Sequence, residues 1–211
     1  MDKQIVQIRL GLFFKSDFTG DFDKFSLELK SKIGDCKETQ HMPVPQSAPS
    51  QIPRFNLIFD GFNIQVAKSR IDIFSANFDK INENISKIWE VLSSLNIEIG
   101  RVGFVKNLFI EGNVDYLKDL LNNKFTDEDF KEINLRVNKR KEVGGVNCNN
   151  IEHIYNGFIT ENTSSKRSGI VLDKDINTLA EDISVNNFNQ EQIKKIISEF
   201  SKESENFIIF V

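Results

Sequence analysis

Apolar side chains at every second position, interrupted by tight turns, constrain the fold of this sequence more than any other feature. They alternate in residues 55–59 and 62–66 and return at positions 71 and 73. Asp60-Gly61, a favoured hairpin turn, separates the first two runs, and Lys68-Ser69 separates the second from the third. Because strand side chains alternate between two faces, the pattern predicts a meander of three antiparallel strands.

A helical pattern follows this meander. Its apolar positions recur at intervals of three and four residues: Ile81, Ile85, Ile88, Trp89, Leu92 and Leu95. A similar order returns later, with extended runs at 133–137, 151–160 and 169–176, then a helix that Asn189 and Gln192 open as a capping box. We therefore predict an α+β fold of mainly antiparallel sheet, in two β-meander-plus-helix halves with the helices packed on one face.

Proline marks the main division of the chain. All four prolines lie between Pro43 and Pro53, so residues 39–53 are predicted to be an extended linker or strap. Residues 1–38 precede it as a strand-helix element. Residues 54–211 follow as the main domain, with halves 54–111 and 130–211, and we expect one compact unit. A short helix after Asn113 and an apolar last strand or docking tail at 207–211 complete the prediction.

Composition excludes several classes of protein. The chain has 211 residues, 39% hydrophobic, which is enough for a packed core. Its net charge of −4 argues against broad electrostatic binding of nucleic acid, and its nineteen Phe against two Tyr indicate core building. No apolar run approaches a membrane span, the N-terminus lacks a signal-peptide pattern, and two distant cysteines imply no disulfide framework. We expect a cytoplasmic protein, and the AT-rich codons of its favoured residues indicate a bacterial gene.

Catalytic signatures are absent from the sequence. It contains no G-x-S-x-G, Walker or dinucleotide-binding motif, so we predict no cofactor and favour a non-enzymatic protein. Asp173 and Asp175 are two apart on a predicted strand and share a face, where they could hold Mg²⁺ or Mn²⁺ together with Asp72 and Asp60. This pattern keeps open a metal-dependent nucleotide or phosphoryl-processing enzyme, although a solvated strand end is the simpler interpretation.

The cysteines and histidines have matching spacings. Cys36 and His41 are five residues apart, and so are Cys148 and His153. These four side chains could form a tetrahedral zinc site if the two segments met, although separate structural roles are the favoured interpretation.

Charged residues on the predicted strands are candidate binding residues. Arg70, Asp72 and Arg101 could share one sheet face, either as a surface ion pair or as the floor of a ligand groove. A basic segment contributes four more candidates: Arg136, Lys139, Arg140 and Lys141. That segment could contact nucleic-acid phosphates, but charges that keep a hairpin soluble are the favoured interpretation.

Three segments of the sequence carry short motifs of known proteins. Residues 88–92 (IWEVL) precede an Arg-Val-Gly strand at 100–107, residues 169–175 (GIVLDKD) contain a Leu-Asp-x-Asp pattern, and the closing helix precedes a Phe-containing end. Together these segments resemble a sporadically distributed family of uncharacterised bacterial proteins. The likeness spans residues 54–211, although the Arg-Val-Gly strand ends in Val-Lys-Asn rather than Arg-Tyr-x-Asn. The resemblance implies an order of strands and helices, but no activity.

These observations together favour binding over catalysis. We expect a protein that acts by binding a protein partner, or by forming a homo-oligomer, and an antitoxin or defence-module component would fit. The alternatives are the metal-dependent enzyme and a nucleic-acid-binding protein.

Overall fold

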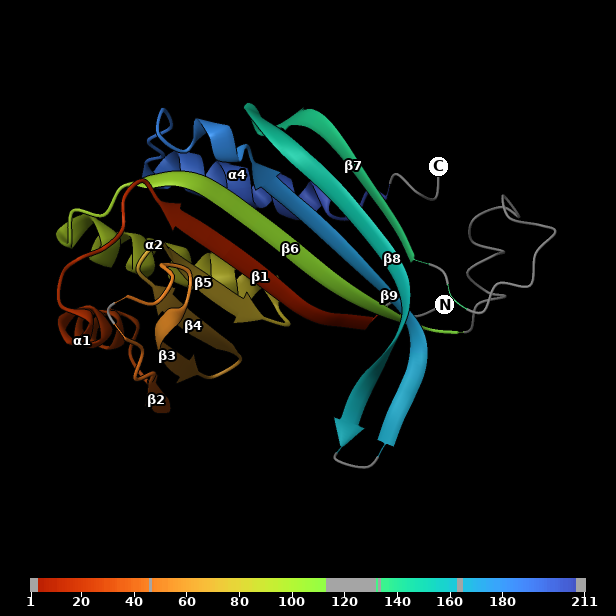
Figure 1. The fold of residues 1–211 in the computed structure, drawn as a ribbon, viewed down its shortest axis with the longest axis horizontal. Helices are drawn as coiled ribbons and strands as arrows, with labels where there is room; N and C mark the ends of the chain where they lie inside the picture. Colours follow the sequence, from red (N-terminus) through yellow and green to blue (C-terminus); the bar gives the residue numbers. More distant parts are fainter. Residues whose placement is uncertain (1–3, 46, 113–131, 133, 163–164, 208–211) are drawn as a thin grey trace.

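One antiparallel sheet organises the chain in the computed structural model, which describes residues 4–45, 47–112, 132, 134–162 and 165–207. Nine strands of these residues are hydrogen-bonded in the order β2-β3-β4-β5-β1-β6-β9-β8-β7 (Figure 1). Their bounds are β1 (Gln4–Phe14), β2 (Glu38–His41), β3 (Pro53–Phe59), β4 (Phe62–Ala67), β5 (Arg70–Ser75), β6 (Ile99–Glu111), β7 (Asn134–Val143), β8 (Val146–Asn162) and β9 (Ser165–Thr178). The prediction of a mainly antiparallel α+β fold is confirmed.

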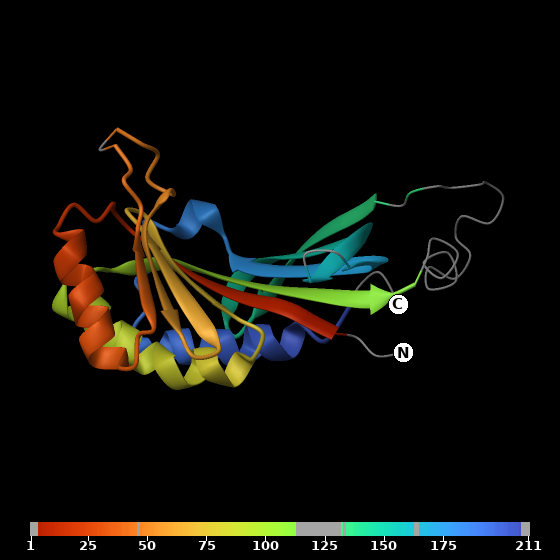
Figure 2. The same ribbon diagram turned by 90° about the horizontal axis from the view of Figure 1, so that it is seen from below.

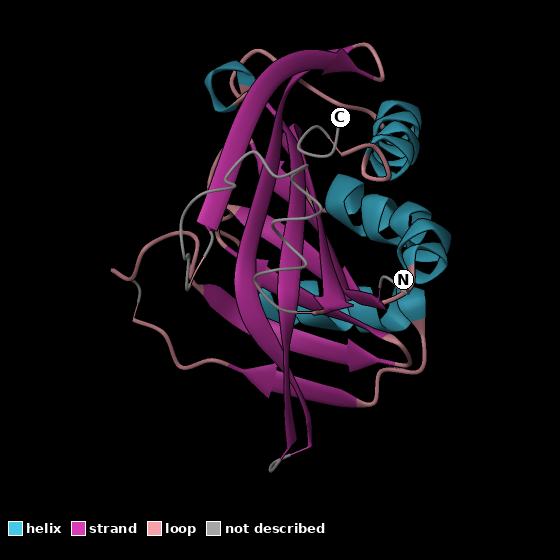
Figure 3. Cartoon of the chain, turned by 90° about the vertical axis from the view of Figure 1, so that its right-hand side faces the viewer, coloured by secondary structure: helices cyan, strands magenta, loops and turns pink. Residues whose placement is uncertain are grey.

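The helices gather on one side of this sheet. They are α1 (Phe22–Ile33), α2 (Phe78–Ser94) and α4 (Gln190–Glu203), whereas the short 3₁₀ helix η1 (Ala180–Asp182) lies on the other side (Figures 2 and 3). Each α-helix begins at a side chain that accepts backbone N–H groups: Asp21, Asn77 and Asn189. Asn189 and Gln192 form the capping box that their spacing predicts. No helix of the described residues is long and apolar enough to cross a membrane.

The main core lies between the sheet and these helices. The apolar stripe of α2 is buried there, and so are the alternating positions of β1, β3, β4 and β5. Phe25 and Phe55 are fully buried with their rings 5.9 Å apart, edge to face. At these positions phenylalanine builds the core, as its abundance predicts.

The two meanders join through the N-terminal strand. β1 pairs with β5 on one side and with β6 on the other, so β3–β5 and β7–β9 belong to one continuous sheet. A helix follows each meander, α2 after the first and α4 after the second. That residues 54–111 and 130–211 form two structurally similar halves remains a prediction.

Some boundaries differ from the sequence prediction. Glu38–His41, mostly inside the predicted linker, forms the edge strand β2 against β3. Its four residues are all polar, so the strand leaves no apolar alternation to recognise. The helix predicted after Asn113 lies outside the described residues, and so does the predicted terminal strand beyond Phe207.

Candidate functional site

Arginine is concentrated on the side of the sheet opposite α1, α2 and α4, which we call the open face. Strand alternation and cross-strand pairing place six of the seven arginines there: Arg9, Arg70, Arg101, Arg136, Arg140 and Arg167. These side chains come from five different strands, although the chain as a whole is acidic. The open face is therefore the most distinctive chemical surface of the described residues.

A buried carboxylate organises the centre of this face. Asp72 on β5 is 3% exposed and forms ion pairs with Arg9 on β1 at 3.0 Å and with its neighbour Arg70 at 2.8 Å. Arg9 also lies over the ring of Phe74, 5.6 Å from its centroid. Two guanidinium groups therefore share one carboxylate in a geometry that fixes all three side chains.

Arg101 on β6 carries a charge that no carboxylate balances directly. Its guanidinium lies 4.7 Å from the ring centroid of Phe13 and donates to the carbonyl of Thr178 and the side-chain oxygen of Asn177. No ion pair involves it among the described residues. Burial lowers the pKa of Arg101, an effect that Asp175 opposes and Arg70 reinforces. The guanidinium therefore has donors oriented at the depression and no ion pair that an incoming anion would have to break.

Asp175 faces the same depression from β9. Burial raises the pKa of this carboxyl, while the hydrogen bond from Asn177 and the charges of Arg101, Arg136 and Arg9 act against that rise. The depression holds about 240 Å³. At its floor a Cβ atom on Gly11 would lie 3.1 Å from both Asp72 and Phe13, so glycine lets these side chains approach the backbone.

The structure brings Arg70, Asp72 and Arg101 together on one face. It adds Arg9, which sequence reasoning missed, and Asp175, which the sequence indicated only as a metal ligand. Arg9 and Asp175 line the same depression. Arg9 lies between the inward-facing Ile8 and Leu10, so the period of two in β1 could have identified it.

Strand alternation divides the predicted basic segment of β7 between two faces. Arg136 and Arg140 lie on the open face, whereas Lys139 and Lys141 lie on the helix side. Two of the charges are paired, Arg140 with Glu181 and Lys141 with Glu203, both at 2.7 Å. Arg136 is exposed and forms no ion pair within the described part of the chain. The four residues are therefore not one basic patch.

The predicted metal ligands do not assemble into a site. Asp173 accepts a hydrogen bond from Asn107, Asp60 lies at the β3–β4 turn beside Lys37, and Asp175 lies in the arginine-lined depression. The two Cys-His pairs stay apart, since Cys36 precedes β2 at one sheet edge and Cys148 lies on β8 near the other. Burial raises the pKa of Cys148 to about 12, which disfavours the thiolate that zinc requires. No group of three His, Cys, Asp or Glu side chains in the described ranges could hold a metal.

Comparisons with known proteins add no family assignment. No protein-family model matches the sequence, and no curated protein matches it significantly. The resemblance to a sporadically distributed bacterial family therefore stays a prediction from short motifs.

Proposed function

We propose that this protein acts by binding, and that its open face recognises an acidic segment of a protein partner. The observation that carries the proposal is the placement of six of the seven arginines on that face. A guanidinium offers a planar fork of donors that matches a carboxylate, and arginine is among the residues enriched at interface hot spots. An antitoxin or defence-module component is one setting for such a partner.

Two arginines are the expected anchors. Arg101 is half-buried, held on Phe13 and without a carboxylate partner, so it is already oriented for an incoming anion. Arg136 is exposed and unpaired among the residues described. Arg9 and Arg70, the other two arginines at the centre, both form ion pairs with Asp72. They therefore contribute shape and rigidity to the face rather than free charge.

Interspersed acidic groups favour a protein partner over nucleic acid. Asp173, Asp175 and Glu181 lie among the arginines, and their carboxylates oppose a continuous phosphate backbone. A protein partner can place its own cations opposite these carboxylates, which makes a face of mixed sign selective. The nucleic-acid alternative would use the same arginines, so one experiment can separate the two.

The test uses the full chain and fluorescence anisotropy with three labelled probes: a Glu/Ser peptide, a Lys/Ser peptide of equal length, and duplex DNA. We expect binding of the acidic peptide alone. Arg136→Glu should weaken that binding about tenfold, because it reverses a charge at the site. Lys139→Glu is the matched control, since it makes the same charge change on the same strand but on the opposite face.

Three outcomes would contradict the proposal. Equal effects of Arg136→Glu and Lys139→Glu would mean that only net charge matters. If the Glu/Ser peptide does not bind, the proposal of an acidic partner is wrong. Preferential binding of DNA, with affinity that falls steeply as salt rises, would assign the face to nucleic acid. Arg101→Gln serves as a second variant, because it removes the other unpaired charge without reversing it.

A further inference from the structure

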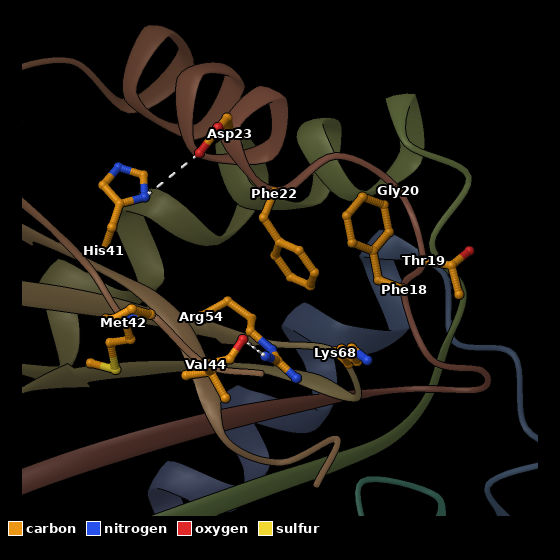
Figure 4. Close-up of a pocket in the computed structure, with 11 residues that line it drawn as sticks. Phe18, Thr19, Gly20, Phe22, Asp23, His41, Met42, Val44, Arg54 and Lys68 are labelled. Atoms are coloured by element: carbon orange, nitrogen blue, oxygen red, sulfur yellow. Dashed lines mark hydrogen bonds and ion pairs between the residues drawn. The ribbon is translucent and has the colours of Figure 1, made fainter. Parts of the chain in front are cut away.

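A second cavity lies away from the arginine cluster of the open face. It holds about 800 Å³ between the loop that precedes α1, the end of β2, and residues 42–45 and 47–52, which we call the strap (Figure 4). This volume falls in the range of about 300–1,000 Å³ that is usual for small-molecule sites. Both apolar rings and cationic side chains line it.

Arg54 is the feature of this cavity that most needs an explanation. Its side chain is 9% exposed, yet no ion pair with a carboxylate involves it among the described residues. The guanidinium donates to the carbonyls of Val44 at 2.9 Å, Pro45 at 3.0 Å and Ala48 at 3.5 Å, and its buried Nε has no partner. Burying a charge without a counter-ion is costly, so an anion bound beside Arg54 would be stabilised by its charge.

Aromatic rings form the opposite wall. Phe18 and Phe22 meet edge to face with centroids 5.2 Å apart, and Phe18 packs at the same distance on the buried ring of Phe25. In Figure 4 the rings of Phe18 and Phe22 lie across the cavity from the side chains of Arg54 and Lys68. Because the core holds the rings, this wall is rigid and suits a flat apolar group.

The strap keeps the cavity open in advance of any ligand. Turns close from Ala48 to Pro45 and from Ile52 to Pro49, and the proline rings fix the backbone around them. Ser50 hydrogen-bonds to Asp17 and accepts from the backbone of Ser69, which ties the strap to the body of the protein. Three of the four prolines lie in this segment, so their clustering has a structural use beyond connecting two strands.

We propose that this cavity binds a small organic anion with an aromatic ring. Its anionic group would lie against Arg54 and Lys68, and its ring against Phe18 and Phe22. Among the charged side chains that line the cavity, two are cationic and Asp23 is anionic, so the balance favours an anion. His41 and Asp23, 3.6 Å apart at the exposed rim, offer polar contacts to the outer end of the ligand. The inference is independent of the proposed function, because it uses none of the arginines of the open face.

Titration calorimetry of the full chain with two matched probe pairs tests this proposal. Adenosine monophosphate is compared with adenosine, and indole-3-carboxylate with indole, so each anion has a neutral counterpart with the same ring. We expect at least one anion to bind about tenfold more tightly than its counterpart. Which anion does so distinguishes an aromatic phosphate from an aromatic carboxylate.

Three variants locate the binding and avoid Arg54, whose loss could unfold the strap. Lys68→Gln should remove most of the preference for the anion, and Phe22→Leu should weaken both members of a pair. Lys202→Gln, the same substitution on α4, should change nothing. The proposal is overturned if neither anion binds at millimolar concentration, if neutral counterparts bind equally well, or if Lys68→Gln behaves like Lys202→Gln.

Discussion

The two meanders present different chemistry to the helices that cover them. In β3–β5 no position facing the helices is charged, and six are apolar and fully buried: Phe55, Leu57, Ile64, Val66, Ile71 and Ile73. Ser75, at the end of β5, is a polar exception. In β6–β9 the corresponding face also carries polar and charged side chains: Lys106, Asn150, Glu152 and Lys174. Both regions have the same strand period and lie in the same sheet. Periodicity alone therefore does not distinguish an apolar sheet–helix interface from one that contains ion pairs.

The second region holds the end of α4 by charge. Lys174 and Glu152 form an ion pair with both side chains fully buried, and Lys174 also donates to the backbone carbonyl of Asn206, just beyond the helix. Asn150 and Lys141 contact the Glu203 carboxylate at 2.8 and 2.7 Å, and Lys106 pairs with Glu205. We call these residues the polar anchor. Cations near the C-terminus of a helix also offset its negative dipole end.

The largest predicted effect comes from breaking the buried pair of the polar anchor. Lys174→Met leaves the Glu152 carboxylate buried without its ammonium partner, and the free energy of unfolding should fall by about 3–5 kcal/mol. Urea denaturation measures this change. The double variant Glu152→Leu/Lys174→Met should recover most of the loss, because neither charge then needs a partner.

The first meander supplies the contrasting substitution. Leu57→Ala should cost about 2–5 kcal/mol through its cavity, and no partner substitution should restore that loss. If the double variant Glu152→Leu/Lys174→Met were as unstable as Lys174→Met alone, the polar anchor would behave like ordinary core, and the contrast between the two meanders would fail.

Local patterns made one part of the fold predictable. The Asp60-Gly61 hairpin, the α2 stripe and the Asn189–Gln192 capping box each depend on residues a few positions apart. The period of two also divides the basic segment of β7 between two faces, although closeness in sequence suggests a single basic patch. Element type and side-chain direction therefore come from nearby residues.

Partners distant in sequence made the rest unpredictable. Lys174 looks like an exposed lysine between two aspartates, and only the pairing of β8 with β9 puts it opposite Glu152. Likewise Arg9 meets Asp72 across 63 positions, and Arg54 finds its acceptors in the carbonyls of a turn. Such sites depend on sheet order and loop shape, which one sequence does not specify locally.

A smaller effect, dependent on pH, is expected at Glu203. Burial opposes its ionisation, but the hydrogen bond and charge of Lys141, with Asn206 and Lys174, outweigh burial and lower the pKa below the ordinary value of 4.5. A carboxyl with a lowered pKa stabilises the fold fully above pH 4.5, and this contribution disappears as pH falls through the folded-state pKa. Glu203→Gln should thus cost about 1 kcal/mol at neutral pH and little in acid.

Denaturation curves across this pH range compare Glu203→Gln with Glu199→Gln, a partly exposed position on the same helix. The control should change little at any pH. A loss for Glu203→Gln that stayed constant down to strongly acid pH would mean that shape, rather than charge, holds the end of α4.

The smallest expected effect concerns an ion pair on the open face with good geometry but little burial. Arg140 and Glu181 approach to 2.7 Å, yet their side chains are 67% and 53% exposed, whereas Lys174 and Glu152 are fully buried. Water and salt screen an exposed pair, so a double-mutant cycle of Arg140→Ala and Glu181→Ala should give a coupling indistinguishable from zero at physiological ionic strength. A coupling as large as that of Lys174 with Glu152 would show that distance rather than burial sets the strength of these pairs, and the charge of Arg140 would then be unavailable to a partner.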